Sequence, residues 1–504
     1  MLRAPMISTL LISFGLVAQT PAPTGPVRLS LQEAIKTSLE NNLQVKVAIE
    51  TKDYTKAGVL ISQGAFDWTL NGNASYGYSK STFENKRFSP VLPPSSGDSK
   101  TDSKNLSLGV VKPFEWGGTF SMAYNPTYQS TTTNITGATP SSSATTTPYT
   151  GTLSASYTQS LLKGFGRQVT EANVIVAKKG AIAADYQYQK AIIDLVASTE
   201  SLYWDVVFAQ RNLENKQQAL TLAQKQLKEN QIRVEVGTLA PIEVTSAEAA
   251  AAQREQDIIA AEAQFANAKD ALIRALYPSS ERPAGLELTE APTLSHLTTD
   301  EKSAEKMAIE RRVELKSARL DYESKQLLEG VAKNRLSPQL DLNLGYNGSA
   351  ANHDTYSPVN TDLWGAKNPG YNVGLTFSMP LPNRTSKGLM AQARANTRSS
   401  QLTMRDLGLG ITLEVRTAFR NVDATEKGVK AAEKTRIFRA KDLEAEQKKY
   451  ENGMSTNFLV LSKQNDLDTA KSAELQSQIS YAKAVTALEK ALGNLLEARK
   501  LELK

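Results

Sequence analysis

Residues able to do acid–base, nucleophilic or metal chemistry are scarce in this chain. It has no cysteine and only two histidines, His296 and His353. Disulfides, thiolate metal sites and a cysteine nucleophile are therefore excluded, and sites built from several histidines are not expected. His353 stands beside Asp354 in a polar stretch with no companion ligand, which is typical of an exposed loop histidine. We predict no enzyme, no metal and no cofactor.

Nucleotide chemistry is not indicated either. Gly164-Phe-Gly166 resembles half of a dinucleotide fingerprint, but the third glycine and a parallel βαβ context are missing, so a bend is predicted. There is no phosphate-binding loop, and energy for any transport would therefore come from a partner. The net charge of +6 over 504 residues is too diffuse to favour nucleic acid as a partner.

The N-terminus predicts export from the cytoplasm. Arg3 precedes an apolar stretch at 6–17, then Ala18 and a proline-rich segment, as in a signal peptide over 1–22 with cleavage near Ala18 or Ala22. A membrane anchor would need about 20 apolar residues, and no later stretch reaches 18. An exported chain of this kind would meet a bilayer as a closed β-barrel or not at all. Without cysteine, no N-terminal lipid anchor is expected.

Six segments alternate apolar and polar residues with a period of two, which predicts strands. They are Phe66–Tyr78, Leu106–Val110, Phe120–Tyr124, Tyr149–Tyr157, Leu340–Tyr346 and Tyr371–Met379. A soluble sandwich would bury the apolar side, whereas an outer-membrane barrel would turn it towards lipid. The period fits both. The signal peptide and three polar linkers, at 80–104, 129–148 and 347–369, favour the barrel, with the linkers as outer loops or disordered insertions.

Long helices separate the strand segments. No proline occurs between Val169 and Val234, and leucine or valine recurs at strict intervals of seven from 206 to 234. Intervals of seven predict a coiled-coil seam, and about 66 helical residues would span ~100 Å. Proline-free stretches at 242–277 and 385–496, the second interrupted near Gly453, predict further long helices. A plain structural coiled coil would explain these helices but not the strands.

The chain contains an internal repeat. Residues 227–276 align with 443–492 without gaps, and a different offset aligns Glu40 and Tyr76 with Glu310 and Tyr346. We therefore expect two structural repeats, 23–284 and 285–504, each with a helix, strands and a helical hairpin. The two offsets differ by 54 residues. This surplus predicts an added strand hairpin in the first repeat, which gives four strands there and two in the second.

Each repeat ends in a tight turn between two helices, at 234–244 and at 450–460. Gly237 and Gly453 suit helix C-caps in the left-handed backbone region. Pro241 suits the first turn of the helix that follows. Each repeat is therefore expected to close as a long helical hairpin whose end lies far from the strands.

These features together resemble the TolC-like family of outer-membrane efflux proteins. The segments that carry the likeness are 29–42 (LSLQEAIKTSLENN), the two hairpin turns, and Leu488–Leu495. The resemblance implies an α+β membrane protein located in the cell outer membrane. In it, a homotrimeric β-barrel continues into a long periplasmic α-helical coiled-coil barrel. The family commonly has four strands per protomer, so the added hairpin would widen the barrel or lie outside its wall.

The resemblance also implies which residues act. The residues expected to dock a periplasmic adaptor at the hairpin ends are Gly237, Thr238, Leu239, Gly453, Met454 and Ser455. Those expected at a periplasmic gate are Glu243, Tyr450, Leu459 and Ser462. Some family members have an acidic ring at positions equivalent to Leu459 and Ser462, and this chain lacks it. Leu459 would form an apolar constriction or pack in the interior.

The function implied is that of an exit duct in a tripartite efflux or type I secretion system. The duct would passively conduct substrates outward from a periplasmic adaptor protein and an inner-membrane pump, and its barrel would contact outer-membrane lipid. A structural coiled-coil envelope protein with a non-conducting β-barrel anchor is the alternative from another class.

Overall fold

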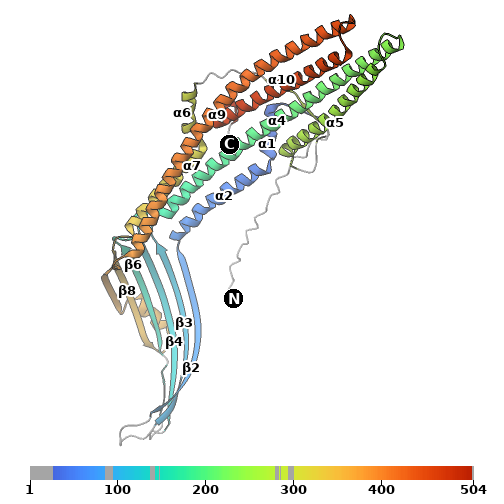
Figure 1. The fold of residues 1–504 in the computed structure, drawn as a ribbon. Coiled ribbons are helices and arrows are strands. Elements are labelled where there is room, and N and C mark those ends of the chain that lie inside the picture. Colours follow the sequence, from blue (N-terminus) through green and yellow to red (C-terminus); the bar gives the residue numbers. More distant parts are fainter. Residues whose placement is uncertain are drawn as a thin grey trace. The chain divides into compact units, whose positions relative to one another are not determined.

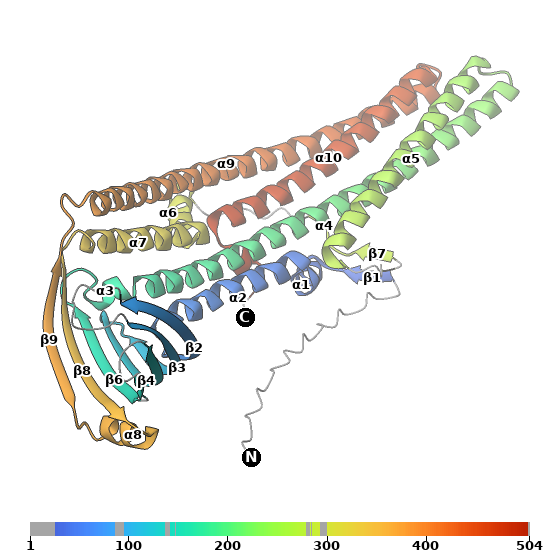
Figure 2. The same cartoon turned by 90° about the horizontal axis from the view of Figure 1, so that it is seen from below.

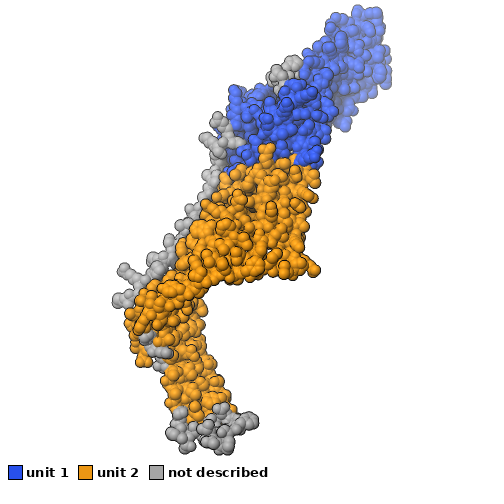
Figure 3. Space-filling model, turned by 90° about the vertical axis from the view of Figure 1, so that its left-hand side faces the viewer, with its two compact units in different colours: residues 1–52, 185–317, 405–504 blue, residues 53–184, 318–404 orange. Residues whose placement is uncertain are grey.

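The computed structural model describes residues 26–85, 95–136, 142–146, 148–278, 283, 285–292 and 300–501. The expected signal peptide, 1–22, and His296 lie outside the described residues. The chain forms two compact units (Figure 3): the first holds residues 1–52, 185–317 and 405–504, and the second 53–184 and 318–404. Each unit contains segments from both halves of the chain, and the division into two repeats stays a prediction.

The long helices predicted from the proline-free stretches are confirmed (Figure 1). The helices are α1 (Leu31–Asn41), α2 (Leu43–Gln63), η1 (Gly64–Phe66), α3 (Arg167–Thr170), α4 (Ala172–Glu235), α5 (Ile242–Leu276), α6 (Glu301–Arg311), α7 (Val313–Asn334), α8 (Tyr356–Trp364), α9 (Arg384–Glu451), α10 (Asn457–Leu492) and α11 (Leu495–Ala498). Among the described residues, no helix is both long enough and apolar enough to cross a membrane.

The predicted strands join one antiparallel sheet in the order β2-β3-β4-β6-β8-β9, with β5 paired to β4. The strands are β1 (Pro26–Leu29), β2 (Thr69–Asn85), β3 (Ser95–Pro113), β4 (Gly118–Thr136), β5 (Ser142–Thr146), β6 (Tyr149–Ser160), β7 (Gly285–Leu288), β8 (Gln339–His353) and β9 (Pro369–Ser378). The added hairpin, β3 and β4, lies within the sheet. The short β5 and the parallel pair β1–β7 were not predicted from the sequence.

The prediction that the polar stretches are linkers is wrong for most of their described residues. β2 runs to Asn85 and β3 begins at Ser95, while the third stretch contains the end of β8 and all of α8. The added lengths of β2 and β3 have no apolar side for the period of two to reveal. Threonine and serine instead face each other across the strands, as Thr101 and Thr131 do with hydroxyl oxygens 3.3 Å apart.

The sheet has one apolar and one polar face, as the alternation predicts. Leu108 pairs with Tyr124, which pairs with Leu153, so the predicted apolar positions fall on one side. On the other side, polar groups bond across strands: the Ser107 hydroxyl donates to Asn125 at 2.5 Å. Figure 2 shows that the sheet curves from β2 to β9 and that α8 lies near the lower end of β8. The helix covers part of the apolar face, around Leu153.

In the first unit, α4 and α10 run antiparallel and are joined at intervals by side chains. Lys216 reaches Asp468 at 2.6 Å, and Ser472 reaches Asn212 at 3.1 Å. Tyr203 of α4 is buried in an apolar core with residues of α5 and α10. Of the five residues at intervals of seven, Val206 is buried and the other four are half-buried. The buried residues of α4 towards the hairpin end are Ala223, Gln226 and Asn230.

Candidate functional site

The two hairpin turns are built alike. Gly237 and Gly453 have φ values of 79° and 75°, in the left-handed region that favours glycine. The Gly237 N–H donates to the carbonyl three residues back at 3.0 Å, and the Thr238 N–H to the one five residues back at 2.8 Å. Gly453 and Met454 repeat the two bonds at 3.1 and 2.8 Å. Both helices therefore end in a Schellman motif, and the predicted glycine caps are confirmed.

The two turns differ in their side-chain bonds, since only the second has a side-chain cap at the start of the helix that follows. Thr456 accepts from the Leu459 N–H at 3.4 Å, whereas no side chain caps the start of α5. The Ser455 hydroxyl donates to the Glu446 carboxylate, which also pairs with Lys449 at 3.1 Å. The Ser455 hydroxyl, and after it Lys449, lowers the pKa of Glu446 below its ordinary value of 4.5. At the first end, the Thr238 hydroxyl donates to the Arg233 carbonyl at 3.0 Å.

Both hairpin ends expose apolar side chains. Met454 and Phe458 are each 72% exposed at the second end, and Val236 and Ile242 are exposed at the first. Leu239 is half-buried. The family resemblance pointed to Met454 but not to the other three.

Four helices meet near these ends at a cluster of buried polar groups, the Asn230 node. It comprises Gln226 and Asn230 of α4, the main-chain carbonyl of Glu243 of α5, Tyr450 of α9 and Asn457 of α10. The Asn230 side-chain oxygen accepts from the Tyr450 hydroxyl at 3.1 Å and from the Gln226 amide at 3.0 Å. The Glu243 carbonyl accepts from Asn230 at 3.4 Å and from Asn457 at 3.5 Å. The node therefore bonds one hairpin to the other.

Tyr450 acts as a donor in this node. Its side chain is buried, and burial raises the pKa of Tyr450 above its ordinary value of 10.0, while Arg233 acts in the opposite sense. The Arg233 guanidinium lies 4.8 Å from the centre of the tyrosine ring, within cation–π range. The phenol consequently stays protonated around neutral pH and keeps its bond to Asn230.

The predicted gate residues occupy different places. Tyr450 belongs to the node, and Glu243 contributes its main-chain carbonyl rather than its carboxylate. Leu459 is 41% exposed, unlike an interior residue, and Ser462 is exposed. Neither bonds to the node. The sequence reading missed Asn230, because polar residues between the apolar positions of a coiled coil usually face solvent.

Two charged clusters hold the helices elsewhere in the first unit. In the Asp468 cluster, Asp468 pairs with Lys216 at 2.6 Å and with Arg254 at 3.2 Å. We call the second the root cluster: Glu200, Thr486, Glu489 and Arg499. The fully buried Glu200 carboxylate accepts from the Arg499 guanidinium at 2.6 and 2.9 Å and from the Thr486 hydroxyl at 2.6 Å. Arg499 also pairs with Glu489 at 2.8 Å.

The sequence matches a known family over more than half of its length. The pattern of the outer membrane efflux protein family covers residues 121–276 and 305–494. The chain is also 26% identical, over 324 residues, to outer membrane protein TolC of Vibrio cholerae. That similarity covers 64% of this chain and 72% of TolC.

Solved structures share the fold. The outer membrane protein VceC of Vibrio cholerae matches with a TM-score of 0.64 and 16% identity, covering 92% of this chain and 96% of VceC. The open state of the MtrE outer membrane channel of Neisseria gonorrhoeae matches with a TM-score of 0.64 and 16% identity, covering 92% and 89%. At such identities the likeness shows the fold. Together with the family match, it shows that this chain belongs to the outer membrane efflux protein family and is an efflux channel of the outer membrane.

Proposed function

We propose that this channel is the exit duct of a tripartite efflux or type I secretion system, and that it acts as a homotrimer. The observation that carries the proposal is the sheet, apolar on one face and polar on the other. Its outermost strands, β2 and β9, each pair on one side only within the described part of the chain. Such edges are templates for further pairing. Three copies would join them into one barrel with a wet lumen, and the helices would continue it through the periplasm.

A periplasmic adaptor protein would dock on the hairpin ends. The support is the exposed apolar pair Met454 and Phe458, together with the glycine-capped turns that hold these side chains outward. The duct would conduct passively, with an inner-membrane pump as the source of energy. For adaptor binding to open the duct, the adaptor must bind the open form of the channel more tightly than the closed form.

The gate would be the Asn230 node. Its bonds join neutral groups at 3.0–3.5 Å, and such hydrogen bonds contribute about 0.5–1.5 kcal/mol each. A few of them would hold the ends closed at rest, yet an adaptor contact on both hairpins could supply the free energy that separates them. Tyr450 would remain in the predicted gate, and Asn230 would be its partner.

Conduction through the purified trimer in planar bilayers tests the duct. We expect a small mean current for the native protein and, through a higher open probability, at least a severalfold larger mean current for a variant with Tyr450→Phe and Asn230→Ala. Tyr277→Phe is the control, because it removes a partly buried phenol that lies outside the node. A trimer that stays silent even as the double variant would contradict the duct and favour the non-conducting envelope protein.

A further inference from the structure

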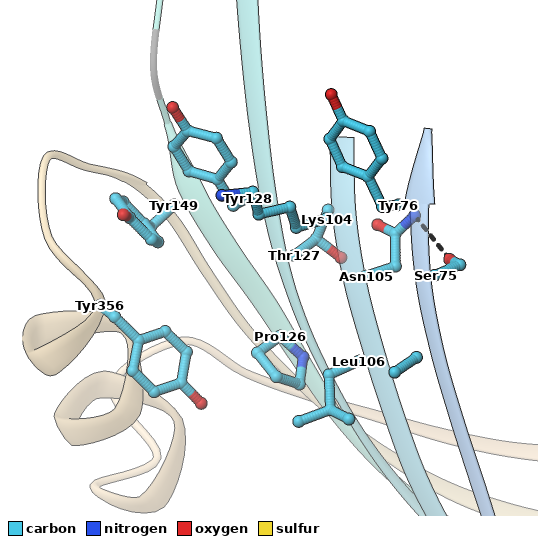
Figure 4. Close-up of a pocket in the computed structure, with 11 residues that line it drawn as sticks. Ser75, Tyr76, Lys104, Asn105, Leu106, Pro126, Thr127, Tyr128, Tyr149 and Tyr356 are labelled. Atoms are coloured by element: carbon cyan, nitrogen blue, oxygen red, sulfur yellow. Dashed lines mark hydrogen bonds between the residues drawn. The ribbon is translucent and has the colours of Figure 1, made fainter. Parts of the chain in front are cut away.

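The apolar face of the sheet carries a pocket that the duct does not use. It has a volume of about 550 Å³ and lies beside α8 over β2, β3, β4 and β6 (Figure 4). Tyrosine dominates its lining. The lining residues used below are Tyr76, Lys104, Leu106, Tyr128, Tyr149 and Tyr356.

The pocket lies where this face changes from apolar to polar. On β3 the residues on this side are Val110, Leu108 and Leu106, followed by Lys104 and Asp102. The strand register places three tyrosines in one row with Lys104: Tyr76, Tyr128 and Tyr149. Tyrosines at such a boundary mark the headgroup level of a membrane protein.

Lys104 supplies a positive charge at that level. Its amine lies 5.5 Å from the centre of the Tyr128 ring and makes no ion pair among the described residues, whereas Lys100 on the same strand pairs with Asp98 at 4.0 Å. The nearest acid along the strand, Asp102, accepts the Tyr76 hydroxyl at 2.8 Å. The pocket therefore offers a cation and, from Tyr128 and Tyr149, phenolic donors, which are groups that bind a phosphate.

Helix α8 turns this part of the face into a pocket. Val359 and Leu363 are fully buried and pack with Leu153 of β6. This packing fixes Tyr356 beside the sheet, with its ring centre 6.5 Å from that of Tyr149. Below the charged level, Leu106 adds apolar surface to the lining. The pocket is thus polar at the level of Lys104 and apolar at the level of Leu106, which matches the polar head and apolar tail of an amphiphile.

We propose that this pocket binds an anionic, phosphate-bearing lipid of the outer membrane. The lipid phosphate pairs with Lys104 and accepts from the hydroxyls of Tyr128 and Tyr149, and an acyl chain lies against Leu106. The proposal rests on the part of the proposed function that places the apolar face in lipid. It does not rest on conduction.

Native mass spectrometry of the intact channel in detergent, titrated with phosphatidylglycerol and with phosphatidylcholine, tests the site. We expect phosphatidylglycerol to bind more tightly, and Lys104→Met to weaken it about fivefold, the effect of one lysine at a lipid surface. Lys100→Met is the matched control, since Lys100 lies on the same strand and side, about 13 Å further into the polar part. The Lys100→Met variant should bind phosphatidylglycerol as tightly as the native protein does.

A second variant tests the pocket without changing charge. Ala74→Trp places an indole in the lining and should also weaken phosphatidylglycerol binding, whereas soluble glycerol phosphate should displace none. Equal binding by Lys104→Met and the native channel, an equal loss in Lys100→Met, or displacement by glycerol phosphate would each overturn the site. Bilayer conductance of the same preparations separates the two proposals. A channel that conducts but shows no preference for phosphatidylglycerol would overturn the lipid site and leave the duct standing.

Discussion

The root cluster and the Asn230 node are both buried polar contacts between α4 and the second hairpin, yet they differ in charge. At the root, Glu200 is fully buried and accepts three bonds of 2.6–2.9 Å, two of them from the Arg499 guanidinium. At the node, neutral amides and a phenol bond at 3.0–3.5 Å. Charge-assisted hydrogen bonds are roughly twice as strong as neutral ones.

The difference indicates where these helices can separate. The Asp468 cluster lies between the two along α10 and is again charged. The hairpins are thus held by ion pairs at the root and in the middle, and at the end by neutral hydrogen bonds and the cation–π contact of Arg233 with Tyr450. The proposed gate at the end would then open without loss of the root.

Arg499→Met should have the largest effect on stability. It leaves the Glu200 and Glu489 carboxylates buried without their cation, and breaking a buried pair costs about 3–5 kcal/mol. Urea unfolding followed by circular dichroism would measure the loss. Arg311→Met is the matched control, since its pair with Glu497 is exposed and contributes at most about 1 kcal/mol. Equal losses of unfolding free energy in the two variants would show that the root cluster is no more stabilising than an exposed ion pair.

Asp468→Asn should have an intermediate effect. The amide keeps the shape of the side chain but removes the charge shared by Lys216 and Arg254, which should cost about 1–3 kcal/mol. Hydrogen exchange in the middle of α10 should rise accordingly. Asp466→Asn, which affects an exposed pair with Arg439, should leave that exchange nearly unchanged. Equal exchange in both would show that the middle of α10 is held by apolar packing alone.

Tyr450→Phe should cost least in stability, about 0.5–1.5 kcal/mol for one neutral hydrogen bond. Its effect should be local: hydrogen exchange should rise near residues 226–243 and 450–460 and not around Glu200. A rise spread along the whole of α4 would contradict the idea that the end separates independently of the root.

Acidic pH should loosen the second hairpin end. Lys463, 2.9 Å away, lowers the pKa of Asp442 below 3.8, and the Ser455 hydroxyl lowers that of Glu446 below 4.5. Because the folded pKa values are the lower ones, the stabilisation is complete above the ordinary values and is lost as pH falls through the lowered ones. Hydrogen exchange, corrected for its intrinsic pH dependence, should therefore increase at 442–463 below about pH 4.5. An end that is equally protected at pH 7 and pH 3.5 would speak against these contacts.

Much of the fold was predictable because it depends on local pattern. A period of two revealed the six strands, and intervals of seven together with missing proline revealed α4, α5, α9 and α10. The polar ends of β2 and β3 escaped prediction because neither of their faces is apolar. Helix α8 escaped because it is short and lies in a polar stretch, although Pro358 in its first turn is a helix-start signal.

The candidate site was less predictable because its parts are far apart in sequence. Tyr450 was identified through family resemblance, but its partner Asn230 lies 220 residues away. No local pattern distinguishes a buried asparagine in a coiled coil from an exposed one. The same holds for the pocket on the sheet, where Lys104 and Tyr356 meet only through strand register and the packing of α8.

The most direct test compares the open probability of the reconstituted channel after substitution at the node and at the root. We predict that Asn230→Ala raises the open probability severalfold at unchanged single-channel conductance. We predict that Arg499→Met lowers stability while leaving the open probability near that of the native channel. A node variant that stays closed, or a root variant that opens as readily as the node variant, would contradict the claim that the separable contact lies at the hairpin ends.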